Sequence, residues 1–599
     1  MIKELCDFGI PVCEKKYGEW NHVALKEEAI SIELVIDNEG RFIRIEPIEK
    51  IATIAEALNS KKGSARLLLD KAEEVLCYGG KVSQKKHSLF LAKLALYQHL
   101  PDLKPVTAFY GDNKIKGMDN ALNGFEDAIP EKGRGGNIGF RIIQEGIRIH
   151  EKPAVRNEII AVYVAKKKDS PRKKCAICGQ TEFPVEDEPH GMIKNVPAGK
   201  SSGCALVSYN ATAFESYELK GNDNSTICVS CARKYVEGLG ALFSEGMPFK
   251  NEKKKDDVLY SYRWPRRRSA SYGLDTGILF WTRNDTDLPE MDLLDVPDAG
   301  AVSTMISAVS SGKNNDTKYI DTEKFYSCVL SGAAARIAVR DWIETSLGEF
   351  RTSIAQWFKD IAIARFDLDQ KKSVTHYASL YALAKSCQRK LLGANKYDDD
   401  DTTWARVASS LWKAAIYNNT RQSSPVPIWI LTKILQRARV DKYGVTPERA
   451  ALIKLILNRN FTGGDFMITE NGIQGEKPIA YICGEIFAKM ESIQHAALGE
   501  RNAGIREKFF SYAMTTPAAA FGRLFNLNSK HFTKLKHEKP GLAVNLDKEL
   551  QELCIGIDID KFPAMFRLEE QGQFAIGYYH QRQKQFAAAT NTNKKEIKK

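Results

Sequence analysis

Two pairs of cysteines constrain this chain more than any other feature of its sequence. Cys175 and Cys178 form one Cys-x-x-Cys pair, and Cys228 and Cys231 form a second one farther along the chain. Each pair places two thiols on one side of a tight turn, which Gly179 permits in the first pair, and two such pairs can surround one tetrahedral metal ion. The spacing therefore predicts a structural four-cysteine zinc module. Two unrelated pairs, or redox pairs, are the alternatives.

Length and charge set the broad class of the protein. The 599 residues are enough for about three or four domains or subdomains. The 87 Lys and Arg outnumber the 75 Asp and Glu, which gives a formal net charge of +12. This balance favours a polyanionic partner such as a nucleic acid. The alternative is a mildly basic protein without such a partner.

The chain lacks the marks of a membrane or secreted protein. No segment has the roughly 20 apolar residues that a membrane span needs. Residues 1–5 carry an early acid and lack the apolar region of a signal peptide. We expect a cytoplasmic protein with no membrane partner, in which clustered cysteines bind metal. The remaining cysteines, such as Cys77 and Cys483, lie mostly in apolar contexts and are expected in cores.

Apolar periodicity predicts an α+β fold. Its parts are a mixed α/β N-terminal region with an inserted four-cysteine zinc module, then an all-α C-terminal region that ends in a helical bundle. Hairpins are predicted over residues 31–45 and 138–149, a helix over 65–76, a buried strand over 274–282, a helical pattern from 333 onward, a helix start at 446–448, and amphipathic stretches at 480–498 and 503–525. The predicted divisions are 1–165 (α+β), 166–260 (zinc module and loop), 261–332 (β-rich), 333–466 (helical) and 467–599 (bundle).

A glycine-flanked segment lies between the cysteine pairs. Residues 199–203 (Gly-Lys-Ser-Ser-Gly) resemble the end of a phosphate-binding loop, but the full motif needs Gly where the chain has Lys194. NTP binding is therefore not expected. A flexible turn is one alternative, and a backbone that approaches a nucleic-acid phosphate or groove edge is the one we favour. The predicted contacts here are Lys194, Lys200, Ser201, Ser202 and the downstream amide Asn210.

Two basic segments could follow a phosphate backbone. Residues 166–174 are rich in Lys and Arg, and residues 263–268 combine four arginines with Trp264, which could stack on a base. Arg266, Arg267 and Arg268 are predicted nucleic-acid contacts. Solvated loops are the alternative for both segments.

Hydrolytic machinery is hard to find in the sequence. The chain has no His-Asp dipeptide, and His150-Glu151 lacks the second His that a zinc-protease helix requires. His580, in an aromatic and polar context, is expected to pack or hydrogen-bond rather than act as a base. We therefore expect a binding protein with no catalytic residues, not an enzyme.

Several blocks resemble the large-subunit family of the type I-C CRISPR surveillance complex, Cascade. They occur in family order along nearly the whole chain, at residues 149–156 (IHEKPAVR), 199–217 (GKSSGCALVSYNATAFESY), 335–342 (ARIAVRDW), 443–450 (YGVTPERA) and 571–582 (QGQFAIGYYHQR), the last being the most specific. Residues 67–72 resemble a further block in which Asn commonly follows the Asp. This chain has Lys71 there, which we include among the predicted nucleic-acid contacts.

The resemblance implies a division of labour between RNA and protein. A CRISPR RNA would read the target sequence, while this subunit would read a short motif flanking the target in double-stranded DNA and help to open the duplex. The implied partners are the CRISPR RNA, the target duplex, the subunit at the guide's 5′ end, the backbone subunit, the small subunit and the helicase-nuclease. The C-terminal helices would favour the displaced strand. The same region would also be made separately as a small subunit, with Met467 as the favoured internal start and Met490 as the second choice.

Two rival functions remain open at this point. One is a zinc-containing transcription regulator, which would bind duplex DNA tightly on its own. The other is a nuclease with an unrecognised site, which would cleave nucleic acid in the presence of metal.

Overall fold

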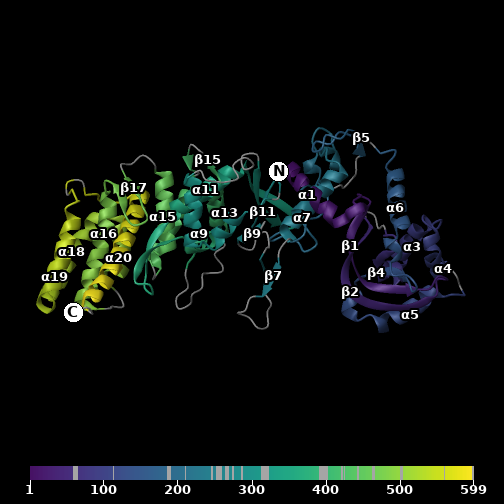
Figure 1. The fold of residues 1–599 in the computed structure, drawn as a ribbon, viewed down its shortest axis with the longest axis horizontal. Helices are drawn as coiled ribbons and strands as arrows, with labels where there is room; N and C mark the ends of the chain where they lie inside the picture. The colour runs from purple at the N-terminus through teal and green to yellow at the C-terminus, as the bar shows by residue number, and fades with distance from the viewer. Residues whose placement is uncertain are drawn as a thin grey trace. The chain divides into compact units, whose positions relative to one another are not determined.

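The structure is a computed structural model that describes the chain outside a set of short gaps. The gaps are residues 58–64, 112–113, 171, 182, 185–189, 210, 245–246, 251–259, 264–268, 273–275, 285, 287, 312–322, 390–402, 420–421, 424, 442–443, 462–465, 500–503, 559, 561 and 597–599. The chain forms two compact units, one of Met1–Asn195 with Lys200–Ser244 and one of Val196–Gly199 with Glu245–Lys599. Figure 1 shows their elements along the chain.

The first unit combines a sheet with helices. Its helices are α1 (Ile2–Tyr17), α2 (Ala72–Val75), α3 (Lys81–Ala95), α4 (Lys104–Gly111), α5 (Gly117–Ala128), α6 (Pro153–Lys166) and α7 (Val229–Ser244). Its strands are β1 (Leu25–Ile36), β2 (Phe42–Glu56), β3 (Leu69–Lys71), β4 (Asn137–Ile142), β5 (Arg172–Lys173) and β6 (Phe183–Pro184).

The sheet of the first unit has the order β2-β1-β4-β3. The turn between β1 and β2 is fixed by Asp37, whose carboxylate accepts hydrogen bonds from the backbone N–H groups of Glu39 and Arg41 at 2.9 and 2.8 Å. This confirms the hairpin predicted over residues 31–45. β4 runs parallel to β1 and antiparallel to β3. Helices α3, α4 and α5 supply aromatic side chains to the same hydrophobic core as β4.

The second unit is mainly helical. Its helices are α8 (Pro289–Asp295), α9 (Ala299–Ser311), α11 (Leu347–Ile361), α12 (Leu380–Ser386), α13 (Thr403–Ile416), α14 (Ile428–Val440), α15 (Pro447–Asn460), α16 (Ile479–Leu498), α17 (Ile505–Thr515), α18 (Pro517–Glu538), α19 (Pro540–Cys554) and α20 (Leu568–Glu596). Its strands are β7 (Met247–Lys250), β8 (Tyr260–Arg263), β9 (Ser269–Tyr272), β10 (Thr276–Thr282), β11 (Lys324–Ala333), β12 (Arg336–Ser346), β13 (Ile363–Asp367), β14 (Lys372–His376), β15 (Asn418–Asn419), β16 (Gln422–Ser423), β17 (Phe466–Ile468) and β18 (Ile473–Gly475).

One continuous hydrophobic core joins the sheet of the second unit to its helices. The antiparallel sheet has the order β12-β11-β10-β9. The core extends from Phe280 of β10 through Trp412 of α13 to Phe574 of α20. The indole N–H of Trp412 donates to the hydroxyl of Ser327 in β11 at 3.1 Å, so the buried indole is satisfied. The predicted fold class is confirmed: an α+β chain with its sheets toward the N-terminus, a four-cysteine cluster and helices in the C-terminal part.

Several predicted elements are also confirmed. α15 begins as predicted: the Thr446 hydroxyl accepts from the N–H of Arg449, and Pro447 occupies the first turn. β10 matches the buried strand, and α16 matches the first amphipathic stretch. The second stretch is broken at Pro517 into α17 and α18.

Three segments differ from the predicted pattern. Residues 65–76 do not form one helix, because Leu68 has a φ of 63° and the Asp70 carboxylate accepts from the N–H of Arg66, which leaves β3 followed by α2. The predicted second arm of the 138–149 hairpin is reduced to one bridge between Arg141 and Arg148.

The helical pattern expected from residue 333 begins only at α11. Residues 336–346 form β12 instead, because their β-branched side chains suit a strand and β11 supplies the pairing partner. The two compact units do not test the five divisions predicted from the sequence, and these stay a prediction.

In each unit, one pair of helices approaches so closely that a glycine is required at the contact. In the first unit, a Cβ on Gly9 of α1 would lie 1.9 Å from the backbone oxygen of Lys234 in α7. In the second unit, a Cβ on Gly484 of α16 would lie 2.1 Å from the backbone oxygen of Phe574, and one on Gly577 of α20 would lie 2.2 Å from that of Tyr481. Backbone atoms cannot move aside as flexible side chains do, so these positions exclude every larger residue.

This geometry predicts the effect of adding one methyl group to the first crossing. Gly9→Ala should lower the stability of the first unit by about 1–3 kcal/mol, because α1 and α7 must separate. Gly240→Ala is the matched control, since a Cβ there meets no atom within 4 Å and alanine favours a helix. Thermal unfolding, with hydrogen exchange across α7, measures both variants. Equal stability of the two would show that the crossing is not tight.

Candidate metal centre and nucleic-acid loop

The two cysteine pairs are folded toward each other by backbone hydrogen bonds. Gly179, with a φ of 71°, donates its N–H to the carbonyl of Cys175 at 3.0 Å and closes the first turn. The N–H of Ala176 donates to the carbonyl of Thr226 at 2.8 Å, which joins the first pair to the chain just before the second. Helix α7 starts directly after Cys228, so the second pair brackets its first turn.

All four thiols converge on one point. Their sulfur atoms lie within 4.8 Å of one another, and those of Cys178 and Cys228 are 3.9 Å apart. Ligands about 2.3 Å from a tetrahedral metal lie about 3.8 Å from one another, so the arrangement fits one metal ion. Two backbone N–H groups already point at sulfur, from Cys228 to Cys175 at 3.3 Å and from Cys231 to Cys228 at 3.4 Å. Within the described ranges, no other group of His, Cys, Asp and Glu converges in this way.

The environment of the thiols also suits a cation. Cys175, Cys228 and Cys231 are buried, whereas Cys178 is exposed. Contact with the Cys231 thiol, together with burial, raises the pKa of Cys228 well above its usual value. Four thiolates can therefore coexist here only around a positive charge.

The crossing of α1 and α7 completes the surroundings of this cluster. The thiol of Cys6 in α1 donates to the carbonyl of Cys231 at 3.2 Å. Farther along the same pair, the carboxylate of Glu237 accepts from the Tyr17 hydroxyl at 2.6 Å and from the Lys16 ammonium at 3.0 Å. Burial raises the pKa of Glu237, but these two partners outweigh it and hold the pKa below its usual value. The contacts of Glu237 with Tyr17 and Lys16 therefore hold α7 against α1.

Helix α7 also holds the segment that leads into the glycine-flanked loop. The imidazole of His190 is 2.8 Å from the hydroxyl of Tyr235 on α7. A Cβ on Gly191 would lie 3.2 Å from the side chain of Val236, so the backbone runs close against the helix. Ile193 and Cys204 then exchange two N–H···O hydrogen bonds of 2.8 Å, which close the base of the loop. Both residues are buried.

The loop presents polar side chains from this fixed base. Lys194, Lys200, Ser201 and Ser202 are exposed. Gly203 has a φ of 110° and donates its N–H to the carbonyl of Lys200 at 2.9 Å, which turns the chain back to the base. Val196–Gly199 group with the second unit, where the N–H of Gly332 donates to the carbonyl of Pro197 at 2.8 Å.

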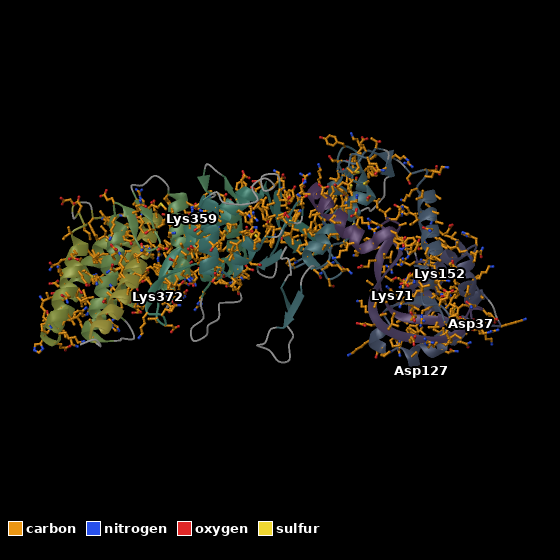
Figure 2. The ribbon with its side chains drawn as sticks, in the orientation of Figure 1. Asp37, Lys71, Asp127, Lys152, Lys359 and Lys372 are labelled. Atoms are coloured by element: carbon orange, nitrogen blue, oxygen red, sulfur yellow. The ribbon has the colours of Figure 1, made fainter. Side chains whose placement is uncertain are left out.

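The predicted nucleic-acid contacts fall into three groups. Lys194, Lys200, Ser201 and Ser202 share the loop. Lys71 is exposed on β3, at the edge of the sheet of the first unit (Figure 2). Asn210, Arg266, Arg267 and Arg268 lie outside the described residues. The role of all these residues in nucleic-acid binding stays a prediction.

Sequence reasoning missed the residues that support the site. Cys6, Glu237, His190 and Tyr235 lie far apart in the chain, and no local pattern pairs them. The one sequence signal was a glycine within each of two helices, Gly9 in α1 and Gly238 in α7, where glycine is otherwise unfavourable. His580 is buried and hydrogen-bonded to Tyr481 at 2.9 Å, which matches the packing role expected of it.

Comparison with known proteins places the chain in a family. Residues 13–586 match the family model described as CRISPR-associated protein (Cas_Csd1), so the chain belongs to that family. No curated protein matched the chain. Among the residues that the structure describes, no helix combines the length and the apolar character needed to cross a membrane.

Proposed function

We propose that this chain is the large subunit of a type I-C CRISPR RNA-guided surveillance complex and acts by binding, not by catalysis. The observation that carries the proposal is the exposed loop around Lys200, which is closed at its base and anchored on α7 in a CRISPR-associated chain. In this proposal the loop reads the motif that flanks the target in double-stranded DNA. The subunit then assists duplex opening, stabilises the R-loop and helps to recruit the helicase-nuclease.

The residue types of the loop suit this task. Lys200 can contact a phosphate and so position the protein, whereas the hydroxyls of Ser201 and Ser202 can donate to or accept from base edges. Small residues let the backbone enter a groove, and the closed base limits the conformational entropy lost on binding. Guide RNA pairing supplies the rest of the specificity.

We further propose that the four thiols hold a structural zinc ion, because four thiolates in a closed tetrahedral site favour zinc. Bound zinc would join the first cysteine turn to the first turn of α7. Tyr235 and Val236 of α7 lie against His190 and Gly191, in the segment that leads into the loop. The metal would therefore support target reading without touching DNA.

The zinc proposal predicts about one zinc per chain. Cys175→Ser should lower the zinc content, increase hydrogen exchange in Val229–Ser244 and weaken target binding by the assembled complex. Cys77→Ser, outside the cluster in the same unit, is the matched control and should retain zinc. Elemental analysis of protein purified without chelator is the direct measurement, and the absence of metal there would remove the claim.

The loop proposal predicts separable effects of its residues. Lys200→Ala should weaken target binding and reduce the slope of log affinity against log salt by about one. Ser202→Ala and Asn210→Ala should weaken binding while leaving that slope unchanged. Guide RNA loading should be intact in all three variants.

Filter binding over a salt series, with flanking-motif variants of the target duplex, makes these measurements. Lys132→Ala is the matched control, because Lys132 is exposed in the same unit but outside the loop. If Lys200→Ala, Ser202→Ala and Asn210→Ala all keep wild-type affinity, the segment that carries them has only a structural role.

The C-terminal helices offer a second basic surface. Arg523, Lys530 and Lys534 are exposed on α18 at steps of seven and four residues, which places them on one face of the helix. Such a face suits a single strand of phosphates, and in this proposal it favours the displaced strand. This charge pattern favours the surveillance complex over the two rival functions, since neither requires a second strand-binding surface.

The rivals differ from the proposal in what the isolated chain does. A transcription regulator would bind duplex DNA tightly without RNA, and a nuclease would cleave it with added metal. In our proposal the chain alone binds weakly and with strong salt dependence, and specificity appears only after assembly with the CRISPR RNA and the other subunits.

The C-terminal bundle is also proposed to exist as a separate small subunit. Met467 lies in β17 with an exposed side chain, so a product starting there keeps all of α16 and loses only Phe466 from the β17–β18 hairpin. Met490 is buried inside α16, and a start there would remove the first half of that helix. Helices α16 to α20 pack on one another, although α20 also contacts α14 and α15.

We predict that cells expressing the gene with its native ribosome-binding context make a short product beginning at or near Met467, and that it joins the complex. Mass spectrometry of the purified complex identifies it. Met467→Leu should remove that product, while Met490→Leu, the matched control, should not. Recovery of the full-length chain alone would contradict the two-product proposal.

A further inference from the structure

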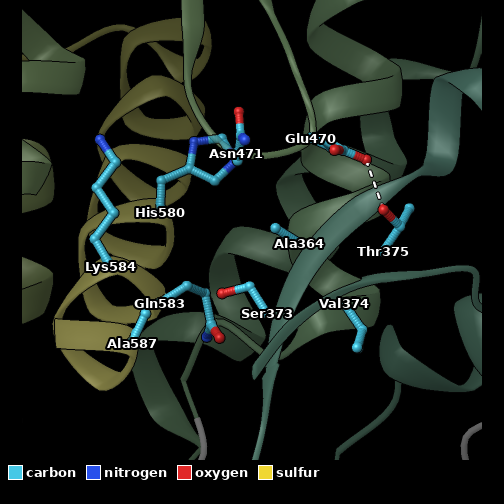
Figure 3. Close-up of a pocket in the computed structure, with 10 residues that line it drawn as sticks. All are labelled: Ala364, Ser373, Val374, Thr375, Glu470, Asn471, His580, Gln583, Lys584 and Ala587. Carbon is cyan, nitrogen blue, oxygen red and sulfur yellow. Dashed lines mark hydrogen bonds between the residues drawn. The ribbon is translucent and has the colours of Figure 1, made fainter. Parts of the chain in front are cut away.

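A cavity of about 390 Å³ lies within the second unit. It is bounded by β13, β14, the turn between β17 and β18, and α20 (Figure 3). Its lining residues are Ala364, Ser373, Val374, Thr375, Glu470, Asn471, His580, Gln583, Lys584 and Ala587. The volume is at the lower end of the range for small-ligand sites, about 300–1,000 Å³.

His580 supplies a buried ring nitrogen to this cavity. The side chain is 1% exposed, and its Nδ1 is 2.9 Å from the hydroxyl of Tyr481. Burial, and then the nearby charge of Glu485, raise the pKa of Tyr481, so its hydroxyl keeps its proton. Nε2, the other ring nitrogen, is itself buried, and the ring lies beside the backbone carbonyl of Glu470.

The charge state of His580 is set by its surroundings. Burial first, then Lys584 and Lys454, lower the pKa of the imidazole to about 3, although the Glu470 carbonyl opposes the shift. The ring is therefore neutral at physiological pH. His580 therefore lines the cavity without adding a charge to it.

Other polar side chains of the lining are held in place by hydrogen bonds and an ion pair with neighbouring residues. The backbone N–H of Phe366 donates to the side-chain oxygen of Gln583 at 2.7 Å, which orients its amide. The Thr375 hydroxyl donates to the Glu470 carboxylate at 3.0 Å, and Lys584 lies 3.2 Å from the buried carboxylate of Glu485. Figure 3 shows Ser373 and Gln583 on one side of the cavity and Asn471 beside the His580 ring.

These groups select the chemistry of the ligand. The single cation and the single carboxylate of the lining are both paired, so the interior favours a neutral molecule rather than a phosphate. Ala364, Val374 and Ala587 form apolar walls, while the amides of Asn471 and Gln583 and the hydroxyl of Ser373 offer donors and acceptors. A flat heterocycle with polar edges meets both requirements, and a nucleobase is such a molecule. Lys372, exposed beside Ser373 in β14, is available for an adjoining phosphate (Figure 2).

We propose that this cavity receives one unstacked base of the displaced DNA strand. The inference rests on the proposed function, which brings that strand to the C-terminal helices, and adds a defined site to it. Capture of a base would oppose re-pairing of the two DNA strands, because an extruded base cannot re-enter the duplex.

The experiment uses the assembled complex with guide RNA and target duplexes that carry 2-aminopurine at successive positions of the displaced strand. With the wild-type chain, emission should rise severalfold at one position or a short run of positions. Ala587→Leu fills the cavity without removing any hydrogen bond and should abolish this rise. Ala588→Leu, on the next residue of α20 and outside the lining, is the matched control and should preserve it.

A second variant guards against loss of folding. Ser373→Ala removes one exposed hydroxyl and should weaken binding of the single strand by about twofold to tenfold, the worth of one hydrogen bond. Equal emission from Ala587→Leu and the wild type would overturn the proposal. If Ala587→Leu and Ala588→Leu both lose the rise in emission while keeping the wild-type thermal midpoint, the proposal is also overturned, because the effect is not specific to the cavity.

Two further arms separate this site from the proposed function. Permanganate reactivity of the displaced strand reports whether the duplex opens at all. If the duplex opens normally but no position gains emission, the cavity proposal fails and the surveillance role stands, whereas failure to open the duplex contradicts the surveillance role itself. If free dAMP binds the complex at this cavity but no strand position responds, the cavity takes a free nucleotide, and the proposal is overturned.

Discussion

Both units of this chain depend on a contact between helix backbones that only glycine allows. Gly9 brings α1 against α7, and Gly484 with Gly577 brings α16 against α20. Such contacts fix the distance and the angle between two helices far more tightly than interdigitating long side chains, because backbone atoms have no rotamers to exchange. Everything described about the two sites lies on one of these helices or next to it.

In the first unit, the close pair places three kinds of chemistry on α7. The first turn of α7 contains Cys231 of the thiol cluster, and Glu237 farther along α7 bonds to side chains of α1. Tyr235 of α7 bonds to His190, in the segment that leads into the loop. In the second unit, the close pair positions Tyr481 against His580, and so places the His580 ring in the wall of a cavity. If either helix crossing were flexible, the groups of the site beside it would be less well positioned. A binding site loses affinity when its groups must first be ordered.

The sequence was informative where function or capping fixes local residue types. The cysteine spacing predicted the thiol cluster, and Thr446 with Pro447 predicted the start of α15, because both are short-range geometric requirements. The pattern failed where distant partners decide the structure. Residues 336–346 form a strand because β11 pairs with them, and Leu68 breaks a predicted helix because Asp70 binds the backbone locally. The pairing of α1 with α7, and the cavity beside α20, combine residues too distant in sequence for any periodicity to connect.

In the proposed function, the closed loop around Lys200 reads the motif beside the target in duplex DNA. The most direct measurement is photo-crosslinking from a reactive side chain placed at position 202, in the complete complex bound to a target whose every position is mapped. The account predicts crosslinks confined to the base pairs that flank the target, and their loss when the flanking motif is changed. Crosslinks to the guide-paired region, or to protein alone, would contradict it.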